Sequence, residues 1–165
     1  MMKKVGLFSA VAIALIVSVT LISAEETPWF DMENCSFCRH LLTDPHLLDN
    51  MTWDQYDIAN GLLIVTTVKP EFQASYLKAM TKMEKLGQEM AAGKTDVKVC
   101  GHCQFYGKLL MSGAKFEHVS TAMGEIDLIT SDKPEVLKMI REYGQRNREE
   151  MAKTEKMEKE IKEEK

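Results

Sequence analysis

The chain has 165 residues, a formal net charge of −4, and a composition that is 45% hydrophobic and 28% charged. This length suits one domain or two very small ones and excludes a TIM barrel, which needs roughly 250 residues, while the hydrophobic content excludes a wholly disordered chain. A pI near 5.6 argues against nucleic-acid binding, which usually requires a basic surface.

The first 24 residues have the pattern of a secretory signal peptide. Lys3 and Lys4 precede an apolar run over residues 5–22, and Ser23-Ala24 then precedes Glu25-Glu26. We expect cleavage after Ala24, which would place the mature protein in the periplasm or outside the cell with no membrane-spanning segment. An uncleaved membrane anchor is the alternative, because the 18 residues of the apolar run nearly span a bilayer.

Removal of residues 1–24 makes the chain more acidic. It deletes two of the 21 basic residues and none of the 25 acidic ones, so the net charge changes from −4 to −6. Residues 146–165 contain seven basic and seven acidic residues, so the excess negative charge lies on residues 25–145. Such a domain repels nucleic acid and anionic lipid. We expect any macromolecular partner to be a protein that contacts the acidic domain or the charged tail, and the sequence does not define the oligomeric state.

Four short patterns recur in the same order, about 64 residues apart. The paired segments are 35–38 and 100–103, 53–54 and 116–117, 59–61 and 122–124, and 65–71 and 129–135. The first pair consists of two CxxC motifs, Cys35-Ser36-Phe37-Cys38 and Cys100-Gly101-His102-Cys103. We infer a tandem duplication within residues 25–145, with repeat one at about residues 35–98 and repeat two at about residues 100–145.

Each repeat is predicted to fold as α-β-β-α. A CxxC motif opens a short helix, which ends before Asp44-Pro45 in repeat one and at Gly113 in repeat two. Asn60-Gly61 is typical of a type I′ hairpin turn, and residues 62–68 have the pattern of a central strand. A closing helix is predicted over residues 70–92, where apolar residues recur at helical spacing, and another from Pro134, whose apolar stripe fades after residue 144.

The two predicted hairpins are expected to join into one four-stranded antiparallel sheet with helices packed on it, because a single hairpin is only marginally stable. The predicted fold class is therefore α+β with a pseudo-twofold axis, preceded by a signal helix over residues 1–24. Residues 146–165 are predicted to form a charged helical tail. Favourable i,i+4 pairs such as Glu149–Lys153 and Glu155–Lys159 support a helix there.

All four cysteines of the chain belong to the two CxxC motifs. Residues i and i+3 lie on one face of a helical turn, so Cys35 and Cys38 form one pair of thiols, and Cys100 and Cys103 form another. A pseudo-twofold axis would bring the two pairs face to face, and four thiolates would then surround one tetrahedral ion, as Zn²⁺ prefers. The sequence thus favours a small exported metal-binding module with a structural zinc ion over an enzyme.

Two histidines and twelve methionines widen the choice of ligands and metal. His40 and His102 lie beside the cysteine pairs and are candidates to replace or supplement a thiolate ligand. Copper is the alternative metal, because soft thioethers suit Cu(I). A simpler explanation also accounts for several methionines, since Met80, Met83 and Met90 lie on the apolar stripe of the helix predicted over residues 70–92.

Two other uses of the cysteines remain open. An exported protein meets an oxidising compartment, where an even number of cysteines usually forms disulfides, and the chain would then be an interaction domain without a metal. The segment Cys100-Gly101-His102-Cys103 resembles the active-site motif of protein disulfide isomerases. The resemblance covers four residues, and it implies a thiol–disulfide oxidoreductase or electron carrier with Cys100 and Cys103 as its catalytic pair. The residues that precede the motif do not have the βαβ pattern of a thioredoxin fold.

Overall fold

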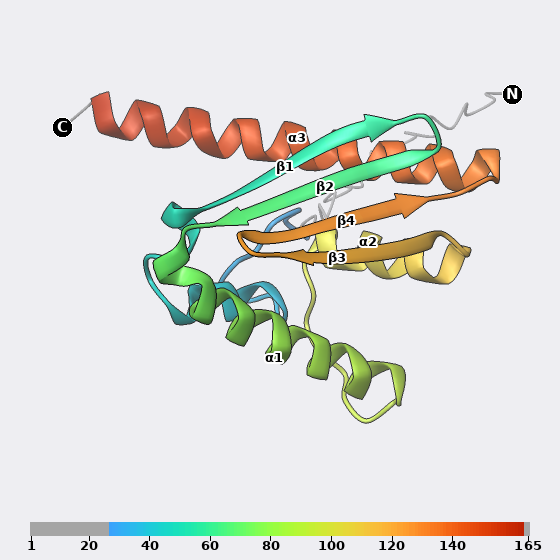
Figure 1. Ribbon diagram of the computed structural model, residues 1–165, viewed down its shortest axis with the longest axis horizontal. Helices are drawn as coiled ribbons and strands as arrows, with labels where there is room; N and C mark the ends of the chain where they lie inside the picture. The colour runs from blue at the N-terminus through green and yellow to red at the C-terminus, as the bar shows by residue number, and fades with distance from the viewer. Residues whose placement is uncertain (1–26, 164–165) are drawn as a thin grey trace, which may run out of the picture.

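A computed structural model of the chain describes residues 27–163, so the predicted signal peptide lies outside the described residues. Residues 27–163 form an α+β fold on one antiparallel sheet of four strands (Figure 1). The strands are β1 Met51–Ile58, β2 Gly61–Val68, β3 Lys115–Thr121 and β4 Gly124–Thr130, and they lie in the order β1-β2-β4-β3. The predicted α+β class, with one four-stranded antiparallel sheet and helices, is confirmed.

The helices of the described region are α1 Gln73–Ala91, α2 Gly101–Ser112 and α3 Pro134–Glu163, with 3₁₀ helices η1 Cys38–Thr43, η2 Leu48–Asn50 and η3 Pro70–Phe72. The helix predicted to follow the first CxxC motif is therefore the 3₁₀ helix η1, whereas the helix predicted to follow the second motif is the α-helix α2. Helix α3 continues without interruption from residue 134 to residue 163. Within residues 27–163, no helix is both long enough and apolar enough to cross a membrane.

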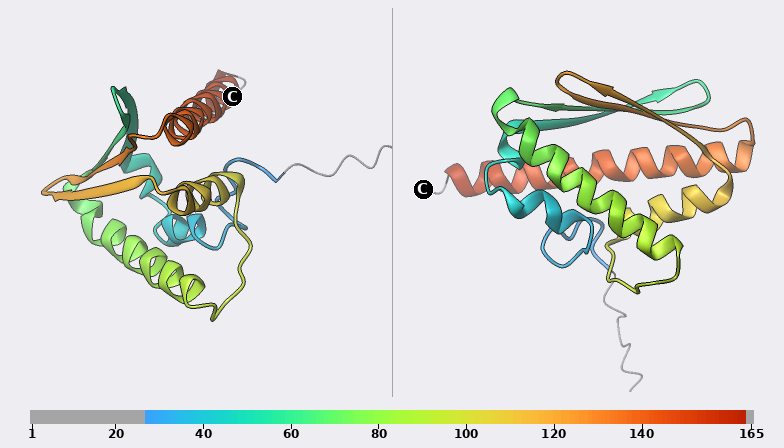
Figure 2. Two further views of the ribbon diagram at one scale, coloured as in Figure 1. Left: turned by 90° about the vertical axis from the view of Figure 1, so that its right-hand side faces the viewer. Right: turned by 60° about the horizontal axis from the view of Figure 1, so that its bottom comes forward.

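The helices gather on one side of the twisted sheet, as the two views in Figure 2 show. Burial alternates along β2: Leu62, Ile64, Thr66 and Val68 are buried, and the residues between them are half-buried. The buried set points to the helical side, since successive side chains of a strand point to opposite faces. The central position of β2, predicted from its nearly continuous apolar sequence, is confirmed by its pairing with both β1 and β4.

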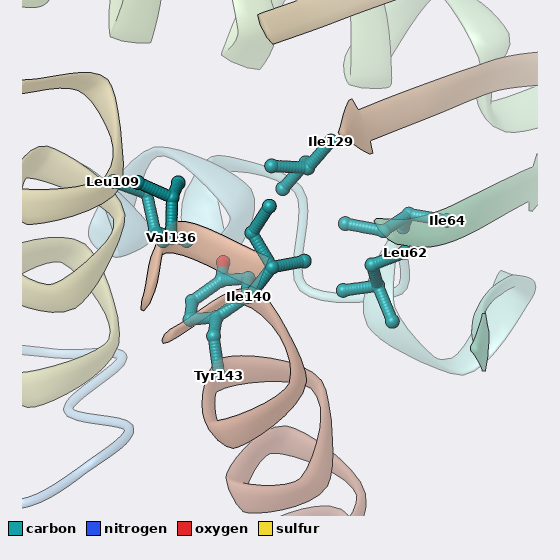
Figure 3. Packing of buried hydrophobic residues seen from close by; sticks show 7 residues of the cluster. All are labelled: Leu62, Ile64, Leu109, Ile129, Val136, Ile140 and Tyr143. Carbon is teal, nitrogen blue, oxygen red and sulfur yellow. The ribbon is translucent and has the colours of Figure 1, made fainter. Parts of the chain in front are cut away.

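The main hydrophobic core lies between the sheet and helices α2 and α3 (Figure 3). Its buried members are Leu62, Ile64, Leu109, Ile129, Val136, Ile140 and Tyr143. Helix α3 lies close to the sheet because Gly144 has no side chain: a Cβ at this position would lie 2.6 Å from a methyl carbon of Leu62. Trp53 and Phe116, which occupy equivalent positions of the two predicted repeats, both pack against the core.

The turn of the first hairpin differs from the prediction. Ile58 pairs with Gly61, so Ala59 and Asn60 form the turn, and among residues 27–163 no non-glycine residue has a positive φ. A type I′ turn needs positive φ at both central residues, so the type I′ prediction is wrong. Gly61 has another role, since a Cβ there would lie 2.0 Å from the carbonyl oxygen of Ile129. The glycine allows β4 to pair closely with β2.

The two hairpins have the same register when residue numbers are shifted by 63. Thr52 pairs with Thr67 in the first hairpin, and Lys115 pairs with Thr130 in the second. At the centre of the sheet, Gly61 pairs with Thr130 and Gly124 pairs with Thr67. Adding 63 to the number of Gly61 and subtracting 63 from that of Thr130 converts the first pair into the second. The sheet is therefore symmetric about the boundary between β2 and β4.

Candidate metal centre

The four cysteine side chains meet between η1 and the N-terminus of α2. The Sγ atom of Cys35 lies 3.6 Å from that of Cys103, and the Sγ atom of Cys38 lies 3.7 Å from those of both Cys100 and Cys103. All four sulfur atoms lie within 4.8 Å of one another. The structure thus brings together the four thiols that the sequence analysis selected as metal ligands.

The sulfur–sulfur distances have the scale of a metal-ligand set. A tetrahedral zinc site with Zn–S bonds of about 2.3 Å has S···S edges of about 3.8 Å. The contacts of 3.6 and 3.7 Å are close to this edge length. They are far longer than a disulfide bond of about 2.05 Å, and all four cysteines are free thiols in the structure. These three contacts join one CxxC motif to the other.

The backbone of each motif places its two sulfur atoms on one side. The amide of Arg39 donates to the carbonyl of Cys35 at 3.1 Å, and the amide of Gln104 donates to the carbonyl of Cys100 at 3.0 Å. Each motif therefore forms one helical turn, which aligns its first and fourth residues. A direct hydrogen bond from the amide of Ser36 to the carbonyl of Lys98, at 2.9 Å, holds the two turns side by side.

Burial and mutual contact control the ionisation of the thiols. Cys35, Cys38 and Cys100 are buried, and Cys103 is half-buried. A hydrogen bond with Cys103 is the main cause that lowers the pKa of Cys100 to about 6. Hydrogen bonds with the other three cysteines, followed by burial, raise the pKa of Cys103. Some thiols of the cluster thus ionise at the expense of others, and a divalent cation would allow all four to be thiolates together.

The two candidate histidines lie outside this group of four sulfur atoms. Both ring nitrogens of His102 face other partners: Nδ1 lies 3.0 Å from Oδ1 of Asn147, and Nε2 lies 3.2 Å from the hydroxyl of Tyr143. The ring packs among Trp29, Phe30, Trp53 and Tyr143, with centroid distances of 5.2–6.1 Å. His40 lies in η1, where burial is the main cause that lowers its pKa.

Asn147 is a residue of this region that the sequence analysis missed. It is completely buried in α3, and its Oδ1 accepts a hydrogen bond from the Trp29 indole nitrogen at 2.8 Å. Its Nδ2 donates to Oε1 of Gln55 in β1 at 3.1 Å. Asn147 follows Ile140 and Tyr143 at helical spacing, which places it on the buried face of the same helix. It was not selected from the sequence because a polar residue does not continue the apolar pattern that marks a buried face.

A second group of ligand atoms lies on strands β3 and β4. Nδ1 of His118 lies 2.9 Å from Oδ1 of Asp127, and Nε2 lies 3.8 Å from Oε2 of Glu125. One ligand atom from each residue lies within 4.8 Å of the others. The hydrogen bond to Asp127 raises the pKa of His118, and burial raises that of Glu125. The three residues form no recognisable motif in the sequence, because only the cross-strand pairing of β3 and β4 brings them together.

Comparisons of the chain with protein-family models, curated proteins and solved structures found no match in any of the three. Function is therefore inferred from the cysteine cluster and its surroundings.

Proposed function

We propose that the protein is a small metal-binding module in which Cys35, Cys38, Cys100 and Cys103 bind one structural zinc ion. The observation that carries the proposal is the set of S···S contacts of 3.6–3.7 Å between the two CxxC motifs. Tetrahedral sets of four sulfur ligands are typical of zinc or iron–sulfur sites, which favours zinc over the alternative of copper. Four protein ligands also complete the coordination of the ion, as in structural rather than catalytic zinc sites.

The ion would stabilise a part of the fold that has little regular structure. Residues 27–50 contain only the 3₁₀ helices η1 and η2. The cysteines pack with Met32, Phe37 and Val99 in a small cluster of their own, separate from the main core. Structural zinc contributes on the order of 10 kcal/mol of folding free energy in small domains, so one ion would firmly attach this segment to α2.

The tandem duplication is part of this proposal. Shifting residue numbers by 63 reproduces the strand register. Shifting them by 65 exchanges the contact between Cys35 and Cys103 with the contact between Cys38 and Cys100. An ancestral repeat that paired with a second copy of itself would supply two thiols per copy to a shared ion.

Disulfide exchange is less well supported by the geometry. An oxidoreductase of the kind that the CGHC sequence resembles would use Cys100 and Cys103 as one reactive pair. Here Cys100 is buried with a relative exposure of 1%, and each sulfur atom of this pair also contacts the other motif at 3.6–3.7 Å. Thiol–disulfide exchange requires access to a sulfur atom. A shared metal ion uses all four thiols and needs no such access.

The test is to purify the untagged protein without chelators and to measure bound metal by mass spectrometry and accessible thiols by alkylation. We expect one zinc per chain and four thiols that react only after unfolding in the presence of a chelator. Titration of the metal-free protein with Co²⁺ should produce thiolate-to-cobalt charge-transfer absorption that saturates at one equivalent. The proposal would be overturned if the protein contained two disulfides. It would also be overturned if the protein were folded without metal and a chelator did not change its unfolding temperature.

A variant separates metal binding from packing. Cys38→Ser should release the zinc and lower the unfolding temperature by roughly 10 °C or more, since each kcal/mol shifts it by about 2–4 °C in a chain of this size. Met32→Leu is the matched control, because Met32 packs on the cluster without being a ligand, and it should keep the zinc. Equal zinc content in the Cys38→Ser and Met32→Leu proteins would contradict the assignment of Cys38 as a ligand.

A further inference from the structure

We propose that His118, Glu125 and Asp127 form a second site, which binds one divalent transition-metal ion through one imidazole nitrogen and two carboxylates. The proposal goes beyond the zinc site of the cysteines and shares no residue with it. We call these three residues the sheet site, because all of them belong to strands β3 and β4.

The strand register places the three side chains on one face. His118 and Asp127 are directly paired across β3 and β4, and Glu125 lies two residues before Asp127. Directly paired residues, and residues two apart on one strand, point to the same side of a sheet. Ile129, two residues after Asp127, is part of the main core. The sheet site therefore points to the side of the sheet that the helices cover.

The ligand atoms converge closely enough to share an ion. Ligands bound to one metal at about 2.0–2.2 Å lie roughly 3 Å apart, and Nδ1 of His118 and Oδ1 of Asp127 are separated by 2.9 Å. Oε1 of Glu125 accepts a hydrogen bond from the Tyr76 hydroxyl of α1, while Oε2 faces His118. Such outer partners orient ligating carboxylates in metal sites. The contact of Oε2 is to Nε2, whereas Asp127 faces Nδ1, so the His118 ring or the Glu125 carboxylate must turn before one ring nitrogen can share an ion with both carboxylates. One ligand atom from each residue already lies within 4.8 Å of the others, which keeps this movement short.

The charge of the sheet site favours a cation. The side chains of Glu125 and Asp127 are only 12% and 33% exposed. Among the described side chains, His118 is the sole ion-pair partner of each, so two partly buried carboxylates share one weakly basic group. Imidazole and carboxylate ligands suit zinc and related divalent ions. Three protein ligands leave coordination positions for water, so this ion would exchange more readily than one held by four cysteines.

Protonation of His118 is the alternative to metal binding at the sheet site. An imidazolium would donate from Nδ1 to Asp127 and would face Glu125 with Nε2, which also lies 3.2 Å from the Ser120 hydroxyl. The two occupants are distinguished by metal stoichiometry, because only an ion-binding site adds a second equivalent of metal to the zinc-loaded protein.

The experiment is calorimetric titration of untagged protein, already loaded with one zinc, with further Zn²⁺. We expect a second binding event of one equivalent, which His118→Ala and Asp127→Asn each weaken at least tenfold while the first zinc remains bound. His46→Ala is the matched control, because His46 is exposed and belongs to neither ligand group. Circular dichroism checks that each variant is folded, and Asp127→Asn retains the side-chain shape.

The outcomes distinguish this proposal from that for the cysteines. Absence of a second event, or a second event that is the same in wild type and in both variants, would overturn the sheet site. If the cysteines bind no zinc, the event at the sheet site should be the first and sole one, and His118→Ala should still remove it. A second event that also disappears in His46→Ala would assign the ion to another surface site and would overturn the proposal.

Discussion

At the scale of single residues, the cysteines and histidines illustrate two kinds of inference. The CxxC spacing was sufficient to select Cys35, Cys38, Cys100 and Cys103, because a local helical turn aligns the sulfur atoms of each pair. The histidine beside the second pair, His102, was selected by proximity in sequence alone. Its orientation depends on Asn147 and Tyr143, which approach from α3 more than 40 positions away. Spacing therefore predicted the sulfur cluster better than it predicted the histidine environment.

A prediction at the residue scale concerns the equivalent glycines Gly61 and Gly124. A Cβ would lie 2.0 Å from a carbonyl oxygen at Gly61 and 2.1 Å from one at Gly124, so alanine must push β2 and β4 apart. We expect Gly61→Ala and Gly124→Ala each to lower the free energy of unfolding by about 1–3 kcal/mol or more, measured by urea denaturation.

The control for the two strand glycines is Gly107→Ala in α2, where a Cβ would meet no atom within 4 Å. This substitution should raise the free energy of unfolding by roughly 0.5–1 kcal/mol, because glycine inside a helix is unfavourable relative to alanine. A gain of stability in Gly61→Ala would show that the close approach of β2 to β4 is not required.

At the scale of elements, the two closing helices pack differently although their sequences begin alike. Helix α1 buries Tyr76 and Ala79, and Tyr76 forms a small core with Leu47 and Val68. Helix α3 lies on the sheet itself and contributes three residues to the main core. The apolar stripe of each helix was visible in the sequence. The sequence did not indicate which element covers each stripe, because helical periodicity predicts that a face is buried but does not identify its packing partner.

A prediction at the element scale tests the attachment of α3 to the sheet. Ile140 is completely buried, whereas Ile161 is 54% exposed in the same helix. Ile140→Ala should lower the free energy of unfolding by about 2–5 kcal/mol, because it removes buried apolar surface and leaves a cavity. Ile161→Ala is the matched control and should change it by less than about 0.5 kcal/mol. Similar losses in both variants, measured by chemical denaturation, would contradict the packing of α3 on the sheet.

At the scale of the whole molecule, the cysteine cluster lies where chain segments from both predicted repeats meet. The segment 28–29 adds to this junction, since the carbonyls of Pro28 and Trp29 accept hydrogen bonds from the amides of Gly101 and His102, each at 2.9 Å. A metal at the cysteines would therefore join the N-terminal segment, η1 and α2. Its removal should loosen these parts first, while the main core between the sheet and α3 retains its own contacts.

The prediction for the whole molecule concerns export, which is proposed from residues 1–24. Protein recovered from its native compartment should begin at Glu25, as determined by N-terminal sequencing and intact mass. Ala24→Leu should slow the processing, because signal cleavage sites require small residues, and the precursor should accumulate. A chain that keeps Met1 and sediments with membranes would instead support the uncleaved anchor.

The sequence by itself determined the elements that depend on neighbouring residues: the two CxxC turns, the alternation of strands and helices, and the central character of β2. These features follow from backbone geometry and side-chain periodicity over a few residues. Only the tertiary structure showed that the two cysteine pairs meet, as the expected pseudo-twofold axis predicts. It alone revealed the network around Asn147 and the sheet site. It also assigned Gly61 to close strand packing instead of a type I′ turn. Such contacts depend on strand register and helix placement, which no local pattern encodes.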